Sequence, residues 1–154
     1  MTFVFDSRTT NRLYQKLRSS IHVATTELSY NNHFELLIAV MLTAQATDKI
    51  VNEVTPSLFK KCPSPKSFIL YGEKKLARLI KRIGLAPTKA KNIIRTCQIL
   101  LKNHNGVIPK TREELVELPG VGRKTANVVL NEAFGMPTIA VDTHVFREAN
   151  RTGL

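Results

Sequence analysis

The chain has 154 residues, of which 43% are hydrophobic and 23% charged, the proportions of a globular domain rather than a disordered or fibrous chain. Its net charge of +11 indicates a polyanionic partner, either nucleic acid or an anionic membrane surface. The longest apolar run, over residues 34–44, is too short to span a bilayer. The N-terminus lacks the basic segment of a signal peptide. We therefore expect a soluble, intracellular protein that binds nucleic acid rather than a membrane.

The sequence gives little support to metal or thiol chemistry. Cys62 and Cys97 lie far apart in the sequence, which favours two reduced, unlinked thiols over a disulfide framework or a metal pair. No serine or cysteine nucleophile motif is present. The four histidines have no ligand spacing; they are His22, His33, His104 and His144.

Apolar residues recur at helical spacing along most of the chain, and no segment alternates convincingly with the period of a strand. The run over residues 138–141 is the one strand candidate, and it has no visible partner. The pattern predicts an all-α fold of eight or nine short helices. The expected helices cover about residues 7–20, 33–43, 48–59, 65–70, 73–83, 88–103, 112–118, 123–134 and 143–150.

Two of these helices carry a specific expectation. The helix that Asn32 should cap is apolar on nearly all sides, which predicts that it lies buried at the centre of the fold. The helix that begins near Asp48 contains Pro56, so we expect a kink or a break near Thr55.

The segment between Lys74 and Lys102, here called the basic stretch, contains nine cations and no acid after Glu73. A solvated helix face usually mixes signs, so this segment favours a surface that follows phosphates. Leu85 lies in the loop at its middle, where it could insert into a base stack or tuck under its own loop. The cations are Lys74, Lys75, Arg78, Lys81, Arg82, Lys89, Lys91, Arg95 and Lys102.

Residues 118–127, Leu-Pro-Gly-Val-Gly-Arg-Lys-Thr-Ala-Asn, organise the C-terminal half of the chain. Thr111 and Glu114 predict a capping box in which the glutamate bonds the Thr111 amide. The helix that they start stops at Gly120, and a second helix starts after Gly122. The pattern therefore predicts a helix, a short hairpin and a second helix.

The hairpin has the features of an anion site. Gly120 and Gly122 leave bare amides at a helix N-terminus, where amides and helix dipole favour an anion. Arg123 and Lys124 lie in the first turn, where the dipole disfavours cations unless an anion is near. The glycines alone are equally consistent with an ordinary helix–helix turn, and the basic pair shifts the balance toward phosphate binding.

Lys124 and Asp142 are the candidate chemical groups. A lysine acts as a nucleophile when its surroundings favour the neutral amine. Asp142 should cap the last helix, whose dipole favours its negative charge. The two could attack a sugar carbon and transfer the protons that follow, and a structural ion pair is the alternative that the residues leave open.

These segments together resemble bacterial endonuclease III, the helix-hairpin-helix DNA glycosylase with AP lyase activity. The resemblance rests on residues 118–131 and on Val-Asp-Thr-His-Val-Phe-Arg over residues 141–147. It continues upstream through residues 34–40, 44–48 and 83–85, and so covers nearly the whole chain.

The resemblance implies an all-α helix-hairpin-helix glycosylase fold, in which a six-helix barrel packs against a second lobe and DNA binds between them. Residues 1–25 would be the N-terminal helix of the second lobe, and residues 26–136 the barrel, with the hairpin unit at about residues 111–134. Residues 137–154 would start the second lobe, which we expect to be incomplete and to lack the iron–sulfur segment.

The implied activity is removal of oxidised pyrimidines, followed by cleavage 3′ to the abasic site by β-elimination. Lys124 would attack the sugar C1′ and form a Schiff base, with Asp142 assisting attack and proton transfer. Gln45 and Leu85 would fill the gap left by the flipped nucleotide. The remaining expected DNA contacts are Gly120, Val121, Gly122, Arg123, Thr125 and His144.

The family carries a [4Fe-4S] cluster on four cysteines downstream of the aspartate, and Cys62 and Cys97 are not those ligands. We therefore expect no cofactor within this chain, which is apparently truncated. The resemblance implies a monomer in the bacterial cytoplasm, acting on double-stranded DNA with oxidised pyrimidines or abasic sites. The alternative is a catalytically impaired, truncated DNA-binding remnant of the same family.

Overall fold

The computed structural model describes residues 6–21 and 24–153, and within them it contains nine α-helices and no strand. The all-α prediction is confirmed. No helix in these two ranges is both long and apolar enough to cross a membrane. The helices are α1 (Ser7–Ser20), α2 (His33–Thr43), α3 (Asp48–Lys61), α4 (Pro65–Tyr71), α5 (Glu73–Leu79), α6 (Ala86–Asn103), α7 (Arg112–Val116), α8 (Arg123–Phe134) and α9 (Thr143–Thr152).

The chain divides into two compact units. Unit 1 combines Met1–Thr26 with Val141–Leu154, and unit 2 is Glu27–Ala140. The resemblance implies boundaries after residues 25 and 136, and the compact units divide after residues 26 and 140. Unit 2 contains α2 to α8 and the hydrophobic core, whereas unit 1 contains α1 and α9.

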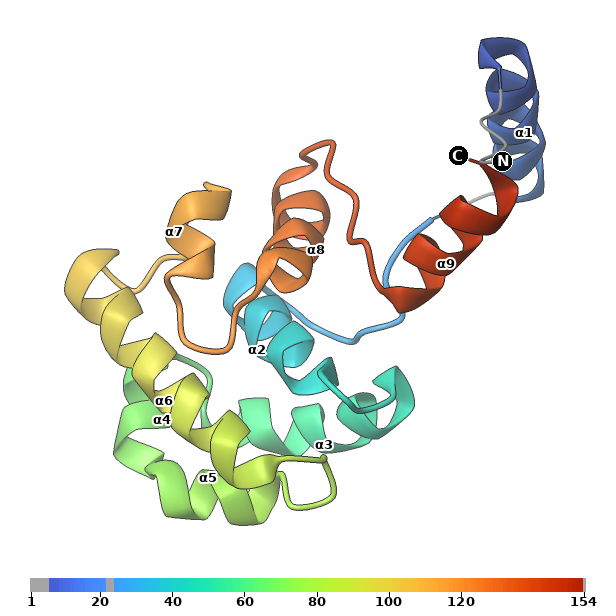
Figure 1. Cartoon of the computed structure of the whole chain (residues 1–154). Coiled ribbons are helices and arrows are strands. Elements are labelled where there is room, and N and C mark those ends of the chain that lie inside the picture. The colour runs from blue at the N-terminus through green and yellow to red at the C-terminus, as the bar shows by residue number, and fades with distance from the viewer. Residues whose placement is uncertain (1–5, 22–23, 154) are drawn as a thin grey trace. The chain divides into compact units, whose positions relative to one another are not determined.

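The centre of unit 2 is α2, which packs against α3, α6 and α8 (Figure 1). All of residues 34–42 are buried, as its all-round apolar pattern predicts. Its first turn is held by polar contacts: the Asn32 side chain accepts the Glu35 amide at 2.9 Å, and the Glu35 carboxylate accepts the Asn31 amide at 2.8 Å. These hydrogen bonds give partners to polar groups at the N-terminal end of the buried helix α2.

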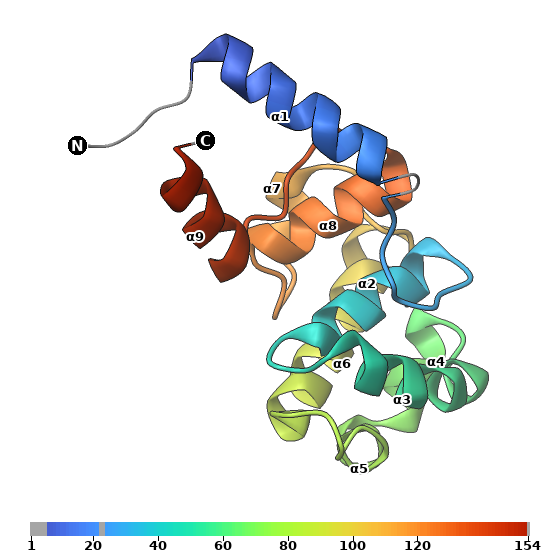
Figure 2. The same ribbon diagram turned by 90° about the vertical axis from the view of Figure 1, so that its right-hand side faces the viewer.

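Helix α8 runs antiparallel to α2, as Figure 2 shows. The His33 ring, at the start of α2, meets the Phe134 ring, at the end of α8, edge to face with 5.0 Å between centroids. Consequently the N-terminal end of α8, with Lys124, lies on the same side of unit 2 as the C-terminal end of α2.

Several helices differ from the sequence predictions, and α3, α5 and α6 show why. Helix α3 continues through Pro56, so the predicted break is wrong; burial of Val51, Val54 and Leu58 outweighs one lost backbone bond. Helix α5 ends at Leu79 rather than at residue 83. A tight turn follows it, in which the Ile83 amide donates to the Ile80 carbonyl at 2.8 Å, and the side chains of Ile80 and Ile83 are both buried.

Helix α6 begins at Ala86, two residues before the predicted start. Pro87 falls in its first turn, where a residue without an N–H breaks no intrahelical bond. The proline therefore belongs to the helix rather than to the loop before it.

In unit 1, neither α1 nor α9 has a buried residue. The apolar face predicted for α1 is present, but Leu17 is exposed, and so are Val145 and Phe146 on α9. Asp6 caps α1 as predicted, by accepting the Thr9 amide at 2.7 Å. The stability of the described structure therefore comes from unit 2.

The two thiols are unlinked and lie in the core of unit 2. Burial raises the pKa of the Cys97 thiol to about 12, and the neighbouring Cys62 adds to the shift. Burial also raises the pKa of Cys62. Neither sulfur is accessible or ionised near neutral pH.

We expect both thiols to be nearly unreactive toward a soluble disulfide reagent at pH 8 and fully reactive in denaturant. Between about pH 8.5 and the folded pKa of about 12, the unfolded chain loses the Cys97 proton before the folded one does. The free energy of unfolding should therefore fall with rising pH more steeply in the wild type than in Cys97→Ala. Equal slopes would contradict the buried thiol.

Candidate nucleic-acid interface

The hairpin between α7 and α8 is in contact with side chains of α6. Gly120 has φ +80°, and a Cβ on it would lie 2.9 Å from the Asn92 side-chain nitrogen. The Thr96 hydroxyl donates to the Pro119 carbonyl at 3.1 Å. Glycine is thus required at position 120 both by backbone conformation and by the close approach of α6.

The capping box ahead of the hairpin is only half formed. The Thr111 hydroxyl accepts the Glu114 amide at 3.3 Å, as predicted. The Glu114 carboxylate, however, accepts the Thr111 hydroxyl instead of the predicted Thr111 amide. The hydroxyl is nearer to the carboxylate because it is already engaged in capping the same turn.

The start of α8 exposes uncapped backbone. Six of the nine described helices have an N-cap residue whose side chain accepts a backbone amide. The N-cap of α8 is Gly122, which has no side chain to accept one. Gly122, Arg123 and Lys124 are all exposed, and Thr125 is half-buried. This end of α8 can therefore offer amides and cations to an anion.

Val121 differs from the other predicted contact residues. Its side chain is only 5% exposed, and its amide donates to the Leu118 carbonyl at 3.0 Å. It anchors the hairpin in the core and keeps the glycines on either side at the surface.

Gln45 and Leu85, here called the wedge residues, lie in two loops that touch. A Cβ on Gly84 would meet the Gln45 carbonyl oxygen at 3.3 Å. Gln45 has φ +55° and Leu85 has φ +61°, a left-handed conformation that costs a residue with a side chain about 1–3 kcal/mol. Leu85 is 55% exposed, so it does not tuck under its own loop.

Lys89 was missed as a site residue by the sequence analysis, which counted it among surface cations. It is 6% exposed, and its ammonium donates to the Leu42 carbonyl at 2.8 Å and to the Ala44 carbonyl. Burial lowers the pKa of this lysine. The available signal was its position beside Ala90 and Ile93 on the inward face of α6.

The rest of the basic stretch lies at the surface. Its other eight cations are all exposed, which agrees with the predicted charged face. Arg82 pairs with Glu53 at 2.7 Å, which offsets one of these charges.

A second element missed from the sequence is a clamp around Asn127. Its side chain accepts from Arg112 Nε at 3.0 Å and donates to the Ile139 carbonyl at 2.9 Å. The Thr138 hydroxyl donates to the Asn127 carbonyl at 2.6 Å. The clamp joins α7 and α8 to the extended segment that ends unit 2.

Asp142 caps α9, as predicted. Its carboxylate accepts the His144 amide at 3.0 Å and the Val145 amide at 2.8 Å. The His144 side chain is exposed. Asp142 and His144 belong to unit 1, whereas Lys124 and the wedge residues belong to unit 2.

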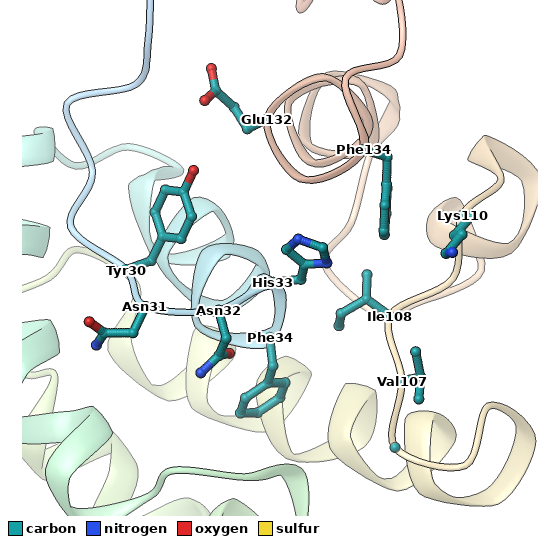
Figure 3. Close-up of a pocket in the computed structure, with 11 residues that line it drawn as sticks. Tyr30, Asn31, Asn32, His33, Phe34, Val107, Ile108, Lys110, Glu132 and Phe134 are labelled. Atoms are coloured by element: carbon teal, nitrogen blue, oxygen red, sulfur yellow. The ribbon is translucent and has the colours of Figure 1, made fainter.

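One pocket of unit 2 lies at the N-terminal end of α2, the end opposite to Gln45. It has a volume of about 820 Å³ and is lined by His33, Phe134 and Lys110 among others (Figure 3). The Lys110 ammonium lies 5.7 Å from the centroid of the Phe134 ring. The candidate interface is therefore an exposed surface rather than an enclosed pocket.

Comparisons with known proteins agree with the resemblance. Residues 38–154 match the family model described as HhH-GPD superfamily base excision DNA repair protein. Endonuclease III of Haemophilus influenzae is 58% identical over 137 residues, which are 89% of this chain and 65% of that protein. Endonuclease III of Escherichia coli K12 is 56% identical over the same shares. The chain thus spans 65% of the length of these two relatives.

Solved structures give the same result. A non-covalent endonuclease III–DNA complex matches with a TM-score of 0.93 and 45% identity, covering 97% of this chain and 70% of that one. A trapped endonuclease III–DNA covalent intermediate matches equally well. A thermostable thymine-DNA glycosylase, at 24% identity and a TM-score of 0.83, shares the fold.

The described residues do not fit the iron–sulfur cluster that the resemblance associates with this family. The chain has two cysteines, whereas such a cluster takes four thiolates, and both are enclosed in the apolar core of unit 2. No group of three or more potential ligands gathers anywhere in residues 6–21 and 24–153.

Gly120→Ala should lower the free energy of unfolding by about 1–3 kcal/mol, because alanine resists the positive φ and its Cβ would press on Asn92. Gly122→Ala is the matched control, since φ is −89° there and no atom lies within 4 Å. Its cost should be about 1 kcal/mol or less. Urea unfolding measures both, and equal losses would contradict the α6–hairpin contact.

Asn127→Ala should cost about 1–3 kcal/mol, because it leaves the part-buried hydrogen bonds to the Ile139 carbonyl and to Arg112 unmade. Hydrogen exchange should become faster at the Thr138 and Ile139 amides, while amides within α2 keep their protection. Unchanged exchange in residues 136–140 would show that the clamp does not hold this segment.

Proposed function

Since the chain belongs to the HhH-GPD superfamily of base excision DNA repair proteins, in its endonuclease III family, we propose that it is a bifunctional DNA glycosylase and AP lyase. It removes oxidised pyrimidines from double-stranded DNA and cleaves 3′ to the abasic site. The observation that carries this proposal is the intact hairpin, with Lys124 exposed at an uncapped helix start. The trapped covalent endonuclease III–DNA intermediate of the relative supports a reaction that passes through a covalent bond to DNA.

In the proposed reaction the Lys124 amine attacks the sugar C1′, and the C1′–N bond to the damaged base breaks. The base leaves with a proton, and the amine nitrogen loses a proton to give an aminal at C1′. The C1′–O4′ bond of the sugar ring then breaks, O4′ takes up a proton, and the nitrogen lone pair forms the C1′=N bond of the Schiff base. Removal of a C2′ proton then breaks the C3′–O bond by β-elimination, and water releases the lysine. The Asp142 carboxylate assists the attack and the proton transfers.

DNA is held by the residues around this lysine. The amides near Gly120 and Gly122 bind a backbone phosphate, with Arg123 and Thr125 beside them. Gln45 and Leu85 fill the gap in the stack once the damaged nucleotide leaves it.

We propose three further properties: another DNA contact, the oligomeric state with its location, and the substrates. His144, at the start of α9, supplies another DNA contact from unit 1. The protein acts as a monomer on the bacterial chromosome, and therefore in the cytoplasm. Its substrates are oxidised pyrimidines and the abasic sites that their removal creates.

The test is borohydride trapping on abasic-site duplex DNA. The wild type should form a covalent adduct, and Lys124→Ala should form none, because the proposed attacking amine is lost. Arg123→Ala is the matched control: it removes the neighbouring charge, weakens binding, and keeps the adduct at saturating protein.

The alternative function is DNA binding without catalysis. It is favoured by one observation: neither α1 nor α9, the two described helices of unit 1, has a buried residue. It predicts salt-dependent binding of DNA by the folded chain, no adduct and no strand cleavage. Binding would then weaken in Lys124→Ala only as expected for one lost charge. A folded wild type that binds DNA but forms no adduct would therefore replace the lyase proposal with this one.

A further inference from the structure

Lys89 connects the two loops that carry the wedge residues. Its backbone amide donates to the Leu85 carbonyl at 2.9 Å, which is the first hydrogen bond of α6. Its ammonium donates to the Ala44 carbonyl, directly before Gln45, and to the Leu42 carbonyl. One residue therefore holds Leu85 through its backbone and the Gln45 loop through its side chain.

Other contacts also restrict the backbone conformation of the Gln45 loop. The Ala46 amide donates to the Thr43 carbonyl at 2.9 Å, and the Gln45 carbonyl lies against Gly84. Residues on both sides of Gln45 are thus fixed while its own side chain remains exposed. A left-handed Gln45 persists only because its neighbours are held in this way.

Burial makes the lysine effective as a link. An ammonium enclosed by protein keeps its charge only where hydrogen-bond acceptors surround it, and the last carbonyls of a helix are such acceptors. The Lys89 side chain is therefore committed to the end of α2 and is not available to a phosphate.

We infer that Lys89 is a positioning residue that holds Gln45 and Leu85 as a single preformed wedge for the gap in DNA. The inference rests on the proposed function, because it assumes that these two side chains enter the stack. Lys89 touches neither DNA nor the reacting atoms; it acts through the two loops.

The test uses the full chain and a duplex with 2-aminopurine opposite a tetrahydrofuran abasic analogue, which needs no catalysis. Entry of the wedge unstacks the opposite base and raises its fluorescence, and anisotropy reports binding separately. Lys89→Met should lose most of the rise at saturating protein, whereas Lys89→Arg, which keeps the donors, should restore it. Lys66→Met removes the same charge from an exposed site on α4 and should match the wild type.

A purely structural role for Lys89 would lower stability and leave the fluorescence rise of the folded, bound fraction unchanged. A wild-type rise in Lys89→Met therefore overturns the inference. Circular dichroism identifies a variant that fails to fold, and Gly84→Val then decides, because its side chain would press on the Gln45 carbonyl with Lys89 intact. A reduced rise in Gly84→Val, with a normal one in Lys89→Arg, supports the inference, and a normal rise in Gly84→Val overturns it.

Borohydride trapping of the wild type separates this result from the proposed function. An adduct without any fluorescence rise overturns the inference and keeps the lyase. A rise that Lys89→Met loses, without any adduct, supports the inference and overturns the lyase. A wild type that gives neither signal overturns both.

Discussion

A helix that is apolar on every side can be buried only if the polar groups at both its ends find partners, and α2 satisfies this condition with two different devices. At its start, Asn32 accepts the Glu35 amide in the usual manner of a cap. At its C-terminal end, the Lys89 ammonium donates hydrogen bonds to the carbonyls of Leu42 and Ala44. An unsatisfied buried carbonyl costs about 1–3 kcal/mol, so the second device is as necessary as the first. Because it comes from α6, it also fixes where α6 lies.

From that point α6 determines most of the candidate interface. Leu85 immediately precedes it, Lys89 holds the Gln45 loop, and Asn92 and Thr96 support the hairpin at Gly120 and Pro119. The span from residue 85 to residue 96 is about 16 Å at the helical rise of 1.5 Å per residue. The residues proposed to contact DNA are thereby attached to one rigid element, and such attachment is what keeps a functional geometry accurate.

The sequence predicted what depends on local rules. Caps at Asn32, Thr111 and Asp142, and the hairpin around Gly120, follow from short-range hydrogen bonding and backbone preference, and the structure has them. The roles assigned to Lys124 and the other site residues came from the resemblance and stay predictions.

What the sequence could not predict depends on long-range contacts. Lys89 was counted with the surface cations because its charge was read without its partners, which lie more than forty residues away. The Asn127 clamp joins α7 to the end of unit 2 and has no local signature. Pro56 was expected to kink or break α3, and the break did not occur because the helix is held by its packing in the core, which a local rule for proline does not include.

The contrast between Lys89 and Lys124 shows what distinguishes a structural lysine from a candidate nucleophile. Burial lowers the pKa of Lys89, yet its nitrogen is occupied by two carbonyls and closed to solvent, so a lowered pKa alone does not identify a nucleophile. Lys89 itself lies in the first turn of α6, but its ammonium reaches the C-terminal end of α2, where the helix dipole stabilises a positive charge. Lys124 lies at the opposite kind of end, exposed in the first turn of α8, where backbone amides and ammonium present the same sign. An ammonium in that position is stabilised by a nearby anion, and a phosphate of the proposed DNA substrate would supply one.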